Sequence, residues 1–264
     1  MKRTILTLSM GLALFAANGQ QKQGRVLYER TVQMRRDPDG MDQMIPPMRK
    51  DKLEVLFGND QSLLRPVKDD AQDEMTAEGD GGGRHVFLMI DGNSDLTYVN
   101  FATDRIVEER EFGARNYIVA DSIRKLNWKL TGETRTVLNY PCQQAIAQRV
   151  GKRMSIAMEN GELKNTEVAD TMTVSAWFTL AIPVPAGPEY QGQLPGLIMA
   201  VDINNGRVVY QAVELSPTVD LGDIKEPSKG KKVSPEQFVK EREKVMKEMQ
   251  SNRGRKGAPI RIGG

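Results

Sequence analysis

The sequence predicts a mainly β protein: a single curved antiparallel sheet, or an incomplete barrel or sandwich, with one C-terminal helix. Short runs that alternate apolar and polar residues recur at close spacing without a helical pattern between them, which is typical of antiparallel strands. Turn-forming residues separate these runs, most clearly Asn204-Asn205-Gly206 between two apolar alternating segments. One later segment instead has helical periodicity, and it follows the last predicted strand.

The N-terminus has the three parts of a signal peptide. Lys2 and Arg3 precede an apolar stretch at residues 5–17, which is too short to span a bilayer as a helix. Residues 17–19 form a small-x-small cleavage site, so we expect residues 1–19 to be removed and Gln20 to begin the mature chain. The alternatives are an uncleaved anchor and a buried N-terminal helix. We therefore expect an exported protein without a transmembrane segment in its mature chain.

The strands are expected within residues 20–224, as one antiparallel domain. The first run, 24–36, alternates apolar and polar residues but is broken at Arg30. Hairpin turns are predicted at 58–60, 91–93 and 204–206, and the acidic, glycine-rich segment 69–83 is predicted to be a loop. The predicted strands are 24–36, 52–57, 62–67, 84–90, 96–101, 104–112, 115–123, 128–138, 143–150, 153–158, 171–182, 197–203 and 207–215.

Residues 225–264 form a basic segment with an amphipathic helix at about 234–251. Ser234 is predicted to cap this helix, with proline at the next position and Gln237 completing a capping box. The segment carries a formal charge of +7, while residues 20–224 carry −7. We expect Gly254 to limit the helix and the end of the chain to be disordered. The basic segment can either be a solvated tail or contact an anionic surface.

A proline and a glycine precede the most apolar strand of the chain. Pro195 cannot lie in the middle of a ladder, and Gly196 can adopt a positive φ, so the pair is predicted to turn the chain into residue 197. Residues 197–201 (LIMAV) are apolar without alternation, which is typical of a strand that is covered on both faces. The proline-rich segment 182–188 before the turn cannot form a regular strand.

Four segments between residues 128 and 201 resemble the GLPGLI family of secreted proteins from Gram-negative bacteria. These segments are 128–135 (WKLTGETR), 139–145 (NYPCQQA), 176–183 (AWFTLAIP, with GP at 187–188) and 193–198 (QLPGLI). The chain departs from the family pattern at Gln193, Asn139 and Gln144. The resemblance implies secretion to the periplasm or cell surface, a β-rich fold, and a structural signature at Leu194, Pro195, Gly196, Leu197, Ile198 and Cys142. It implies no catalytic residues.

The chain is poor in catalytic side chains. Cys142 is its single cysteine, so it is a buried hydrophobe, a free nucleophile or an intermolecular bridge. His85 is the single histidine, which excludes a histidine-rich zinc site. A minor alternative is a copper site at Met41, Met44 and Met48. Glu133 could pair with Asp104, Glu108, Glu109 or Glu111, but the spacing selects no pair.

The leading functional hypothesis is a non-enzymatic exported binding protein without a cofactor. An apolar small molecule or a peptide would lie on the concave face of the sheet, lined by Trp128, Trp177, Phe178 and Leu197. The second hypothesis is a cell-envelope interaction protein that docks through its basic helix or acidic body, with peripheral membrane contact as one form of it. A carboxylate-dependent hydrolase ranks last. No nucleic-acid partner is expected.

Overall fold

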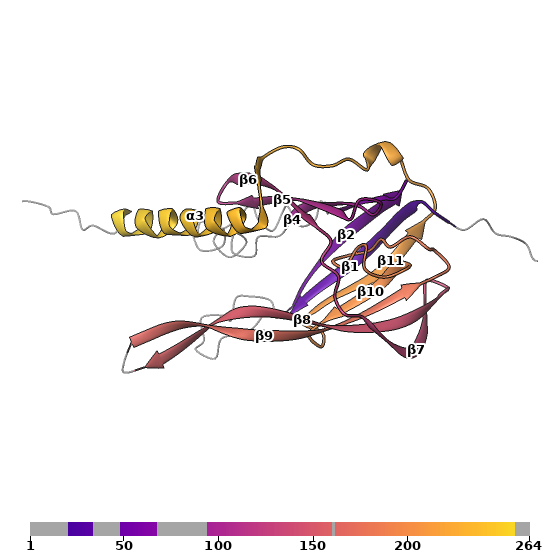
Figure 1. Ribbon diagram of the computed structural model, residues 1–264, viewed down its shortest axis with the longest axis horizontal. Helices are drawn as coiled ribbons and strands as arrows, with labels where there is room; N and C mark the ends of the chain where they lie inside the picture. Colours follow the sequence, from indigo (N-terminus) through magenta and orange to yellow (C-terminus); the bar gives the residue numbers. More distant parts are fainter. Residues whose placement is uncertain (1–20, 34–47, 68–93, 160–161, 257–264) are drawn as a thin grey trace, which may run out of the picture.

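The computed structural model describes residues 21–33, 48–67, 94–159 and 162–256. Its strands form one open sheet in the order β12-β6-β5-β4-β3-β2-β1-β11-β10-β9-β8-β7 (Figure 1). The bounds are Gly24–Gln33 (β1), Met48–Gly58 (β2), Gln61–Pro66 (β3), Ser94–Asn100 (β4), Arg105–Phe112 (β5), Arg115–Ser122 (β6), Lys129–Val137 (β7), Tyr140–Glu159 (β8), Glu162–Thr179 (β9), Leu197–Ile203 (β10), Val208–Ser216 (β11) and Lys231–Val233 (β12). The 3-10 helix η1 spans Leu221–Asp223, and the helix α3 spans Pro235–Lys256. The predicted fold class is confirmed.

Several predicted elements differ from the structure. The pair of strands predicted on either side of Gly151 is wrong, because β8 runs through this residue without interruption. The strand β12 and the helix η1 were not predicted; β12 pairs in parallel with β6, whereas the other described pairs are antiparallel. The signal peptide, the strand at 84–90, the turn at 91–93, the loop at 69–83, His85, Met41 and Met44 lie outside the described residues.

The helix α3 begins as predicted and ends later. The Ser234 side chain accepts a hydrogen bond from the Gln237 backbone at 3.2 Å, and the Gln237 side chain accepts one from the Ser234 backbone at 2.9 Å. This confirms the capping box. Phe238 and Val245 are buried against a small cluster at β6 and β12. The helix continues past Gly254 to Lys256. No helix in the described part of the chain is long and apolar enough to span a membrane.

The strand β10 lies inside the sheet, between β9 and β11, and residues 197–201 are all almost fully buried. This confirms the prediction of a strand that is covered on both faces. A bulge interrupts its pairing with β9 between Ile198 and Ala200. The Ile198 carbonyl, next to this bulge, accepts a hydrogen bond from the Tyr28 hydroxyl at 2.6 Å. The buried phenol therefore ties β1 to the irregular part of β10.

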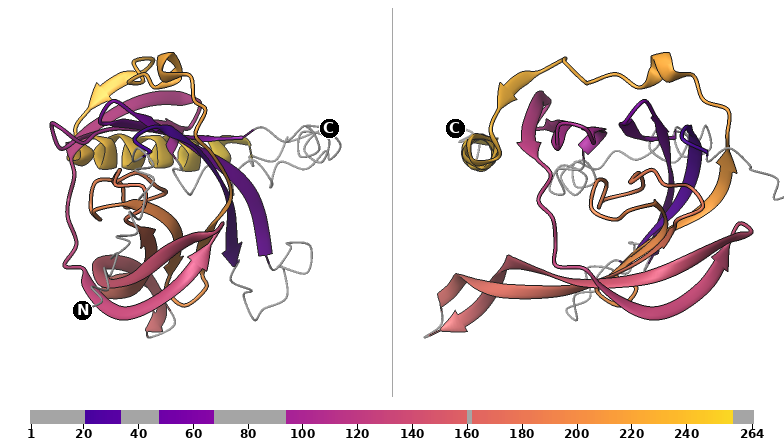
Figure 2. Two further views of the ribbon diagram at one scale, coloured as in Figure 1. Left: turned by 90° about the vertical axis from the view of Figure 1, so that its right-hand side faces the viewer. Right: turned by 45° about the vertical axis from the view of Figure 1, so that its right-hand side comes forward.

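The connection from β9 to β10, residues 180–196, fills the inside of the curved sheet, and we call it the plug (Figure 2, orange). Ile182, Val184 and Ala186 are buried in the same cluster as core residues of β1 and β2. Backbone hydrogen bonds from Leu197 to Ile182 (3.0 Å) and from Ile198 to Ala186 (2.9 Å) attach the plug to β10. The apolar part of the concave face is therefore covered by the chain's own residues.

Two glycines allow the plug to approach the sheet. Gly196 lies so close to the end of β9 that a Cβ atom there would be 2.1 Å from the Thr179 carbonyl oxygen. Gly187 has a φ of 150°, and a Cβ atom there would be 2.5 Å from the Ile198 Cβ. Residues with a side chain cannot occupy either position without moving the backbone or the core. The positive φ predicted for Gly196 is not observed, and a glycine is needed there because the chain passes so close to the end of β9.

Glu54 anchors the outer side of β2 through two arginines. It is almost fully buried and accepts hydrogen bonds from Arg25 and from the Arg65 Nε, the latter at 2.5 Å. Burial alone would raise the pKa of Glu54, but the two guanidiniums outweigh it and hold the pKa below its ordinary value of 4.5. A carboxylate whose pKa is lowered by folding stabilises the folded state at pH values above its unfolded-state pKa. This contribution is lost as the pH falls through the folded-state pKa.

Changing Glu54→Gln is therefore expected to lower the free energy of unfolding at pH 7 by about 1.5–3 kcal/mol, the range for hydrogen bonds to charged groups. This difference in stability should shrink steadily as the pH falls below 4.5. Glu54 then becomes protonated and loses its charge in the wild type, whereas the glutamine variant has no charge to lose. Urea unfolding at pH 7 and pH 3 measures both values. Glu214→Gln is the control, because Glu214 is exposed and makes a single 3.2 Å contact with Arg25. An equal deficit at both pH values would contradict the assignment.

Candidate functional site

The four predicted ligand-binding residues do not line one pocket. Trp177 and Phe178 are neighbours on β9, so their side chains point to opposite faces of the sheet. Leu197 is buried in the cluster that contains the plug residues, and Trp177 packs against that cluster. Phe178 is buried in a second cluster, against which Trp128 packs. These side chains are divided between two parts of the core.

The signature residues have structural positions. Cys142 is fully buried and unpaired, and burial raises the pKa of its thiol. This confirms the prediction of a small buried hydrophobe and makes Cys142 a poor nucleophile, because the thiolate is the reactive form. Leu194, Leu197 and Ile198 are buried in the core. Met48, from the copper alternative, begins β2 and is half-exposed.

The candidate carboxylates of a hydrolase lie far apart in the sheet. Glu133 is exposed on β7, while Glu108, Glu109 and Glu111 lie on β5 and Asp104 directly precedes it. Eight strands lie between β5 and β7 in the sheet order, and the two strands lie on opposite halves of the molecule in both views of Figure 2. The structure does not bring these carboxylates together.

A polar cluster lies on the concave side instead. Arg30 is on the same face of β1 as Val26 and Tyr28, which pack with the plug. Its guanidinium donates two hydrogen bonds to Asp51 on β2, Nε to Oδ1 at 2.7 Å and Nη2 to Oδ2 at 2.6 Å. Arg30 also lies directly opposite Tyr210 on β11. The paired charges therefore sit beside a buried tyrosine.

Two residues of the plug, Glu189 and Tyr190, complete this polar cluster. The Tyr210 hydroxyl donates a hydrogen bond to the Glu189 Oε1 at 2.5 Å, and Glu189 has a φ of 62°, which is strained for a residue with a side chain. Tyr190 is buried with its ring at 5.4 Å from the Trp128 ring, in an edge-to-face arrangement. We call Arg30, Asp51, Arg149, Glu189, Tyr190 and Tyr210 the rim cluster.

The Tyr190 hydroxyl is buried and donates no hydrogen bond to any of the described residues. Arg149, which is exposed on β8, lies close enough for its charge to act on this hydroxyl. Burial raises the pKa of Tyr190, the negative charge of Glu189 adds to this, and Arg149 opposes it without cancelling it. Tyr190 therefore keeps its proton at neutral pH and is a hydrogen-bond donor.

Tyr210 and Arg30 also keep their protons at neutral pH. Burial raises the pKa of Tyr210, and the nearby Glu189 carboxylate raises it further. Burial would lower the pKa of Arg30, but Asp51 outweighs this and the pKa is raised. The rim cluster thus presents two protonated phenols and a protonated arginine. Such groups are suited to binding by hydrogen bonds and charge.

Sequence reasoning missed the rim cluster, although β1 contained a signal for it. Arg30 interrupts the apolar face of that strand, and a charged residue at an apolar position indicates a buried partner or a site. The partners could not be identified, because Asp51, Arg149 and Glu189 come from segments far apart in the sequence. Of the predicted ligand residues, Trp128 contacts Tyr190, and Phe178 lies in the same buried cluster as Tyr190 and Tyr210.

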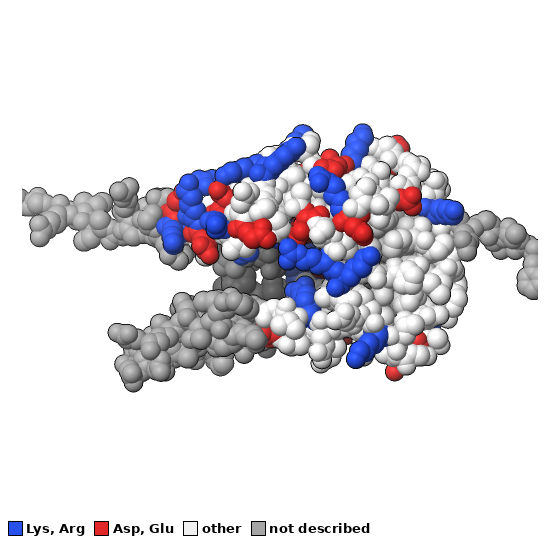
Figure 3. All heavy atoms as spheres, in the orientation of Figure 1, with Lys and Arg blue, Asp and Glu red and all other residues white. Residues whose placement is uncertain are grey.

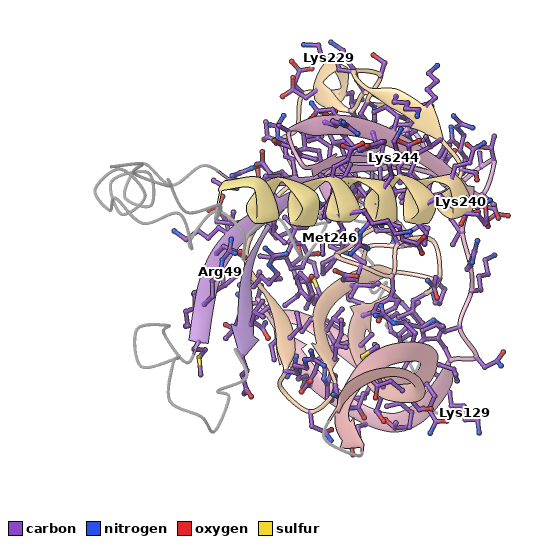
Figure 4. The ribbon with its side chains drawn as sticks, turned by 90° about the vertical axis from the view of Figure 1, so that its left-hand side faces the viewer. Arg49, Lys129, Lys229, Lys240, Lys244 and Met246 are labelled. Atoms are coloured by element: carbon purple, nitrogen blue, oxygen red, sulfur yellow. The ribbon has the colours of Figure 1, made fainter. Side chains whose placement is uncertain are left out.

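Cationic side chains also gather away from the rim cluster. Figure 3 shows lysine and arginine side chains along α3 and across the top of the molecule, and others around the hollow between α3 and the β8–β9 side. Figure 4 shows Lys240, Lys244 and Met246 on α3 and Lys229 above it. Ion pairs from Lys231 to Glu241 (2.7 Å) and from Arg115 to Glu248 (3.0 Å) attach α3 to the neighbouring strands.

Comparisons with known proteins agree with the fold and supply no activity. No curated protein matches the chain. Two crystal structures of PNGF-II, in space groups P21 and C2, match with TM-scores of 0.51 at 17% and 16% sequence identity. The matches cover 85% and 84% of this chain but 34% and 33% of PNGF-II, so the chain spans about a third of those structures. Residues 128–200, which coincide with the segments that resemble the GLPGLI family, match the sequence model of a family described as a protein of unknown function (Porph_ging).

Proposed function

We propose that this chain is an exported, non-enzymatic binding protein that holds a carboxylate-bearing ligand at the rim cluster, on the concave side of its sheet. The observation that carries the proposal is the buried Tyr190 hydroxyl, which donates no hydrogen bond to any of the described residues and lies beside the exposed Arg149. A buried donor without an acceptor costs about 1–3 kcal/mol, so a ligand that supplies the acceptor gains that energy on binding.

A carboxylate suits this pair of donors better than a neutral oxygen. The guanidinium of Arg149 can donate to a carboxylate in two directions, and the Tyr190 hydroxyl can donate to the same group. The other acidic groups of the cluster are already engaged, since Asp51 accepts from Arg30 and Glu189 accepts from Tyr210. The ligand would therefore bring its own negative charge to Arg149.

The apolar part of the ligand would be small. The plug covers the deeper apolar residues of the concave face, including Leu197. Met172 and Val208 are partly buried against the cluster that contains Tyr190 and Tyr210, so they remain available for a modest apolar contact. This favours a small organic acid or the C-terminal end of a peptide over a wholly apolar molecule.

We expect the dipeptide acetyl-Leu-Leu with a free carboxylate to bind at least about tenfold more tightly than its C-terminal amide, because a hydrogen-bonded charge contributes about 1.5–3 kcal/mol. Tyr190→Phe removes the hydroxyl and keeps the ring, and Arg149→Gln removes the charge. Each should weaken binding of the acid about tenfold without weakening binding of the amide. Isothermal titration calorimetry measures these affinities.

The control variant is Arg124→Gln, which removes another exposed guanidinium that pairs with Asp121. It should leave the affinity for the acid unchanged. Equal binding of acid and amide, or an unchanged affinity in both Tyr190→Phe and Arg149→Gln, would overturn the proposal.

A further inference from the structure

The side chain of Gln193 attaches the plug to the connection between β6 and β7. This connection, residues 123–128, passes beside the plug (Figure 2). The Gln193 Oε1 accepts a hydrogen bond from the Leu126 backbone N–H at 2.9 Å and another from the Trp128 Nε1–H at 3.1 Å. Both partners are donors, so only the oxygen of the amide can face them. The orientation of the Gln193 side chain is therefore fixed.

Trp128 links Gln193 to the tyrosine at the ligand site. Its ring meets the Tyr190 ring edge to face, with the ring centroids 5.4 Å apart, and both rings pack in the same core cluster. An indole has one N–H donor and no acceptor, so its bond to Gln193 determines how the ring is turned. The Tyr190 hydroxyl is rigidly attached to its own ring, so the orientation of that ring determines where the hydroxyl points. Gln193 therefore acts on the hydroxyl through Trp128.

The backbone of Gln193 adds a second constraint on Tyr190. Its N–H donates a hydrogen bond to the Tyr190 carbonyl at 3.3 Å and closes a turn over residues 190–193. Inside this turn, Gly192 has a φ of 77° and donates a hydrogen bond to the Pro185 carbonyl at 2.7 Å. Tyr190 is thus held at its backbone and at its ring. A donor that is held in place before binding loses less conformational freedom when the ligand arrives.

We propose that Gln193 is a positioning residue of the rim cluster, which acts through Trp128 to direct the Tyr190 hydroxyl at the carboxylate of the ligand. This proposal rests on the proposed function and adds to it the residue that sets the preference for an acid over its amide. Gln193 performs this role without touching the ligand.

Changing Gln193→Met removes the acceptor oxygen and keeps the length of the side chain. In isothermal titration calorimetry, we expect the affinity for acetyl-Leu-Leu with a free carboxylate to fall about fivefold, while the affinity for its C-terminal amide stays the same. Trp128→Phe removes the same hydrogen bond from the other side and should have a similar effect. Equal weakening of acid and amide would mean that the role of Gln193 is only structural, which would overturn the proposal.

Hydrogen exchange of the indole N–H groups reports on the same hydrogen bond without any ligand. In NMR spectra, the Trp128 indole signal is identified by its loss in Trp128→Phe. We expect this signal to exchange about fivefold faster or more in Gln193→Met. The Trp177 signal is the internal control, since Trp177 packs against a different core cluster, and its exchange rate should not change. Unchanged exchange at Trp128 would overturn the proposal.

A double-mutant cycle tests the path through Trp128. Combined with Trp128→Phe, Gln193→Met should cause no further loss of affinity for the acid, because the hydrogen bond is already absent. A further loss in the double variant, or full discrimination between acid and amide in Gln193→Met, would overturn this proposal alone. Equal binding of acid and amide by the wild type would instead overturn the proposed function, and this proposal with it.

Discussion

Replacing Gly196 with alanine is expected to lower the free energy of unfolding by about 3 kcal/mol or more, among the largest effects of any single substitution in this chain. The added Cβ would lie 2.1 Å from the Thr179 carbonyl oxygen and 2.8 Å from its carbonyl carbon. Both atoms belong to the backbone at the end of a buried strand, so neither can move aside cheaply. Thermal unfolding should show a midpoint lowered by roughly 6–12 °C.

Gly151→Ala is the matched control. Gly151 lies within β8, and a Cβ atom there would be 3.8 Å from its nearest neighbour, the Asp170 carbonyl oxygen. Alanine also restricts the unfolded chain more than glycine does, so stability should stay the same or rise by about 0.5 kcal/mol. Equal losses in the two variants would mean that the close approach at Gly196 is not the cause.

The second large effect is expected at Ile182, in the plug. Ile182 is fully buried in the cluster shared with β1, β2 and β10, and Ile182→Ala leaves a cavity there. Such truncations cost about 2–5 kcal/mol, and urea unfolding measures the loss. Leu180→Ala removes a side chain of similar size two residues earlier, where 48% of the leucine surface is exposed, and should cost less than about 1 kcal/mol.

The comparison of these two plug variants also bears on the function. A large loss at Ile182 with a small loss at Leu180 would mean that the plug is part of the core, as its burial indicates. The concave face could then offer a ligand only its polar end, where Arg149 and Tyr190 lie. Similar, small losses in both variants would mean that the plug leaves the sheet readily, and an apolar ligand could then replace it.

The local chemistry of the chain was sufficient to predict most of the elements. Turn residues that tolerate positive φ, such as Asn204 and Asn205, occupy the predicted hairpin, and Ser234 caps the predicted helix. The apolar run at 197–201 predicted a strand buried on both faces, which is what β10 is. Each of these features depends on neighbours within a few residues, so the sequence alone determines it.

The local sequence was not sufficient to predict the strands β8 and β12. Gly151 resembled a turn between two strands, but β9 pairs with residues on both sides of it and extends β8 through it. The three-residue strand β12 has no strand pattern of its own and exists because Lys231–Val233 lies beside β6. In both cases tertiary pairing outweighs local propensity, which is weak for strands.

By itself, the sequence determined the class of fold, the turns and the capped helix, because these depend on short-range sterics and hydrogen bonds. Only the tertiary structure decided that the plug fills the concave face, that Trp177 and Phe178 belong to different parts of the core, and that Arg30, Glu189 and Tyr190 meet. Those relations depend on how the sheet curves and on which distant segments it brings into contact. Curvature and contact arise from the packing of the whole chain, and no short stretch of residues encodes them.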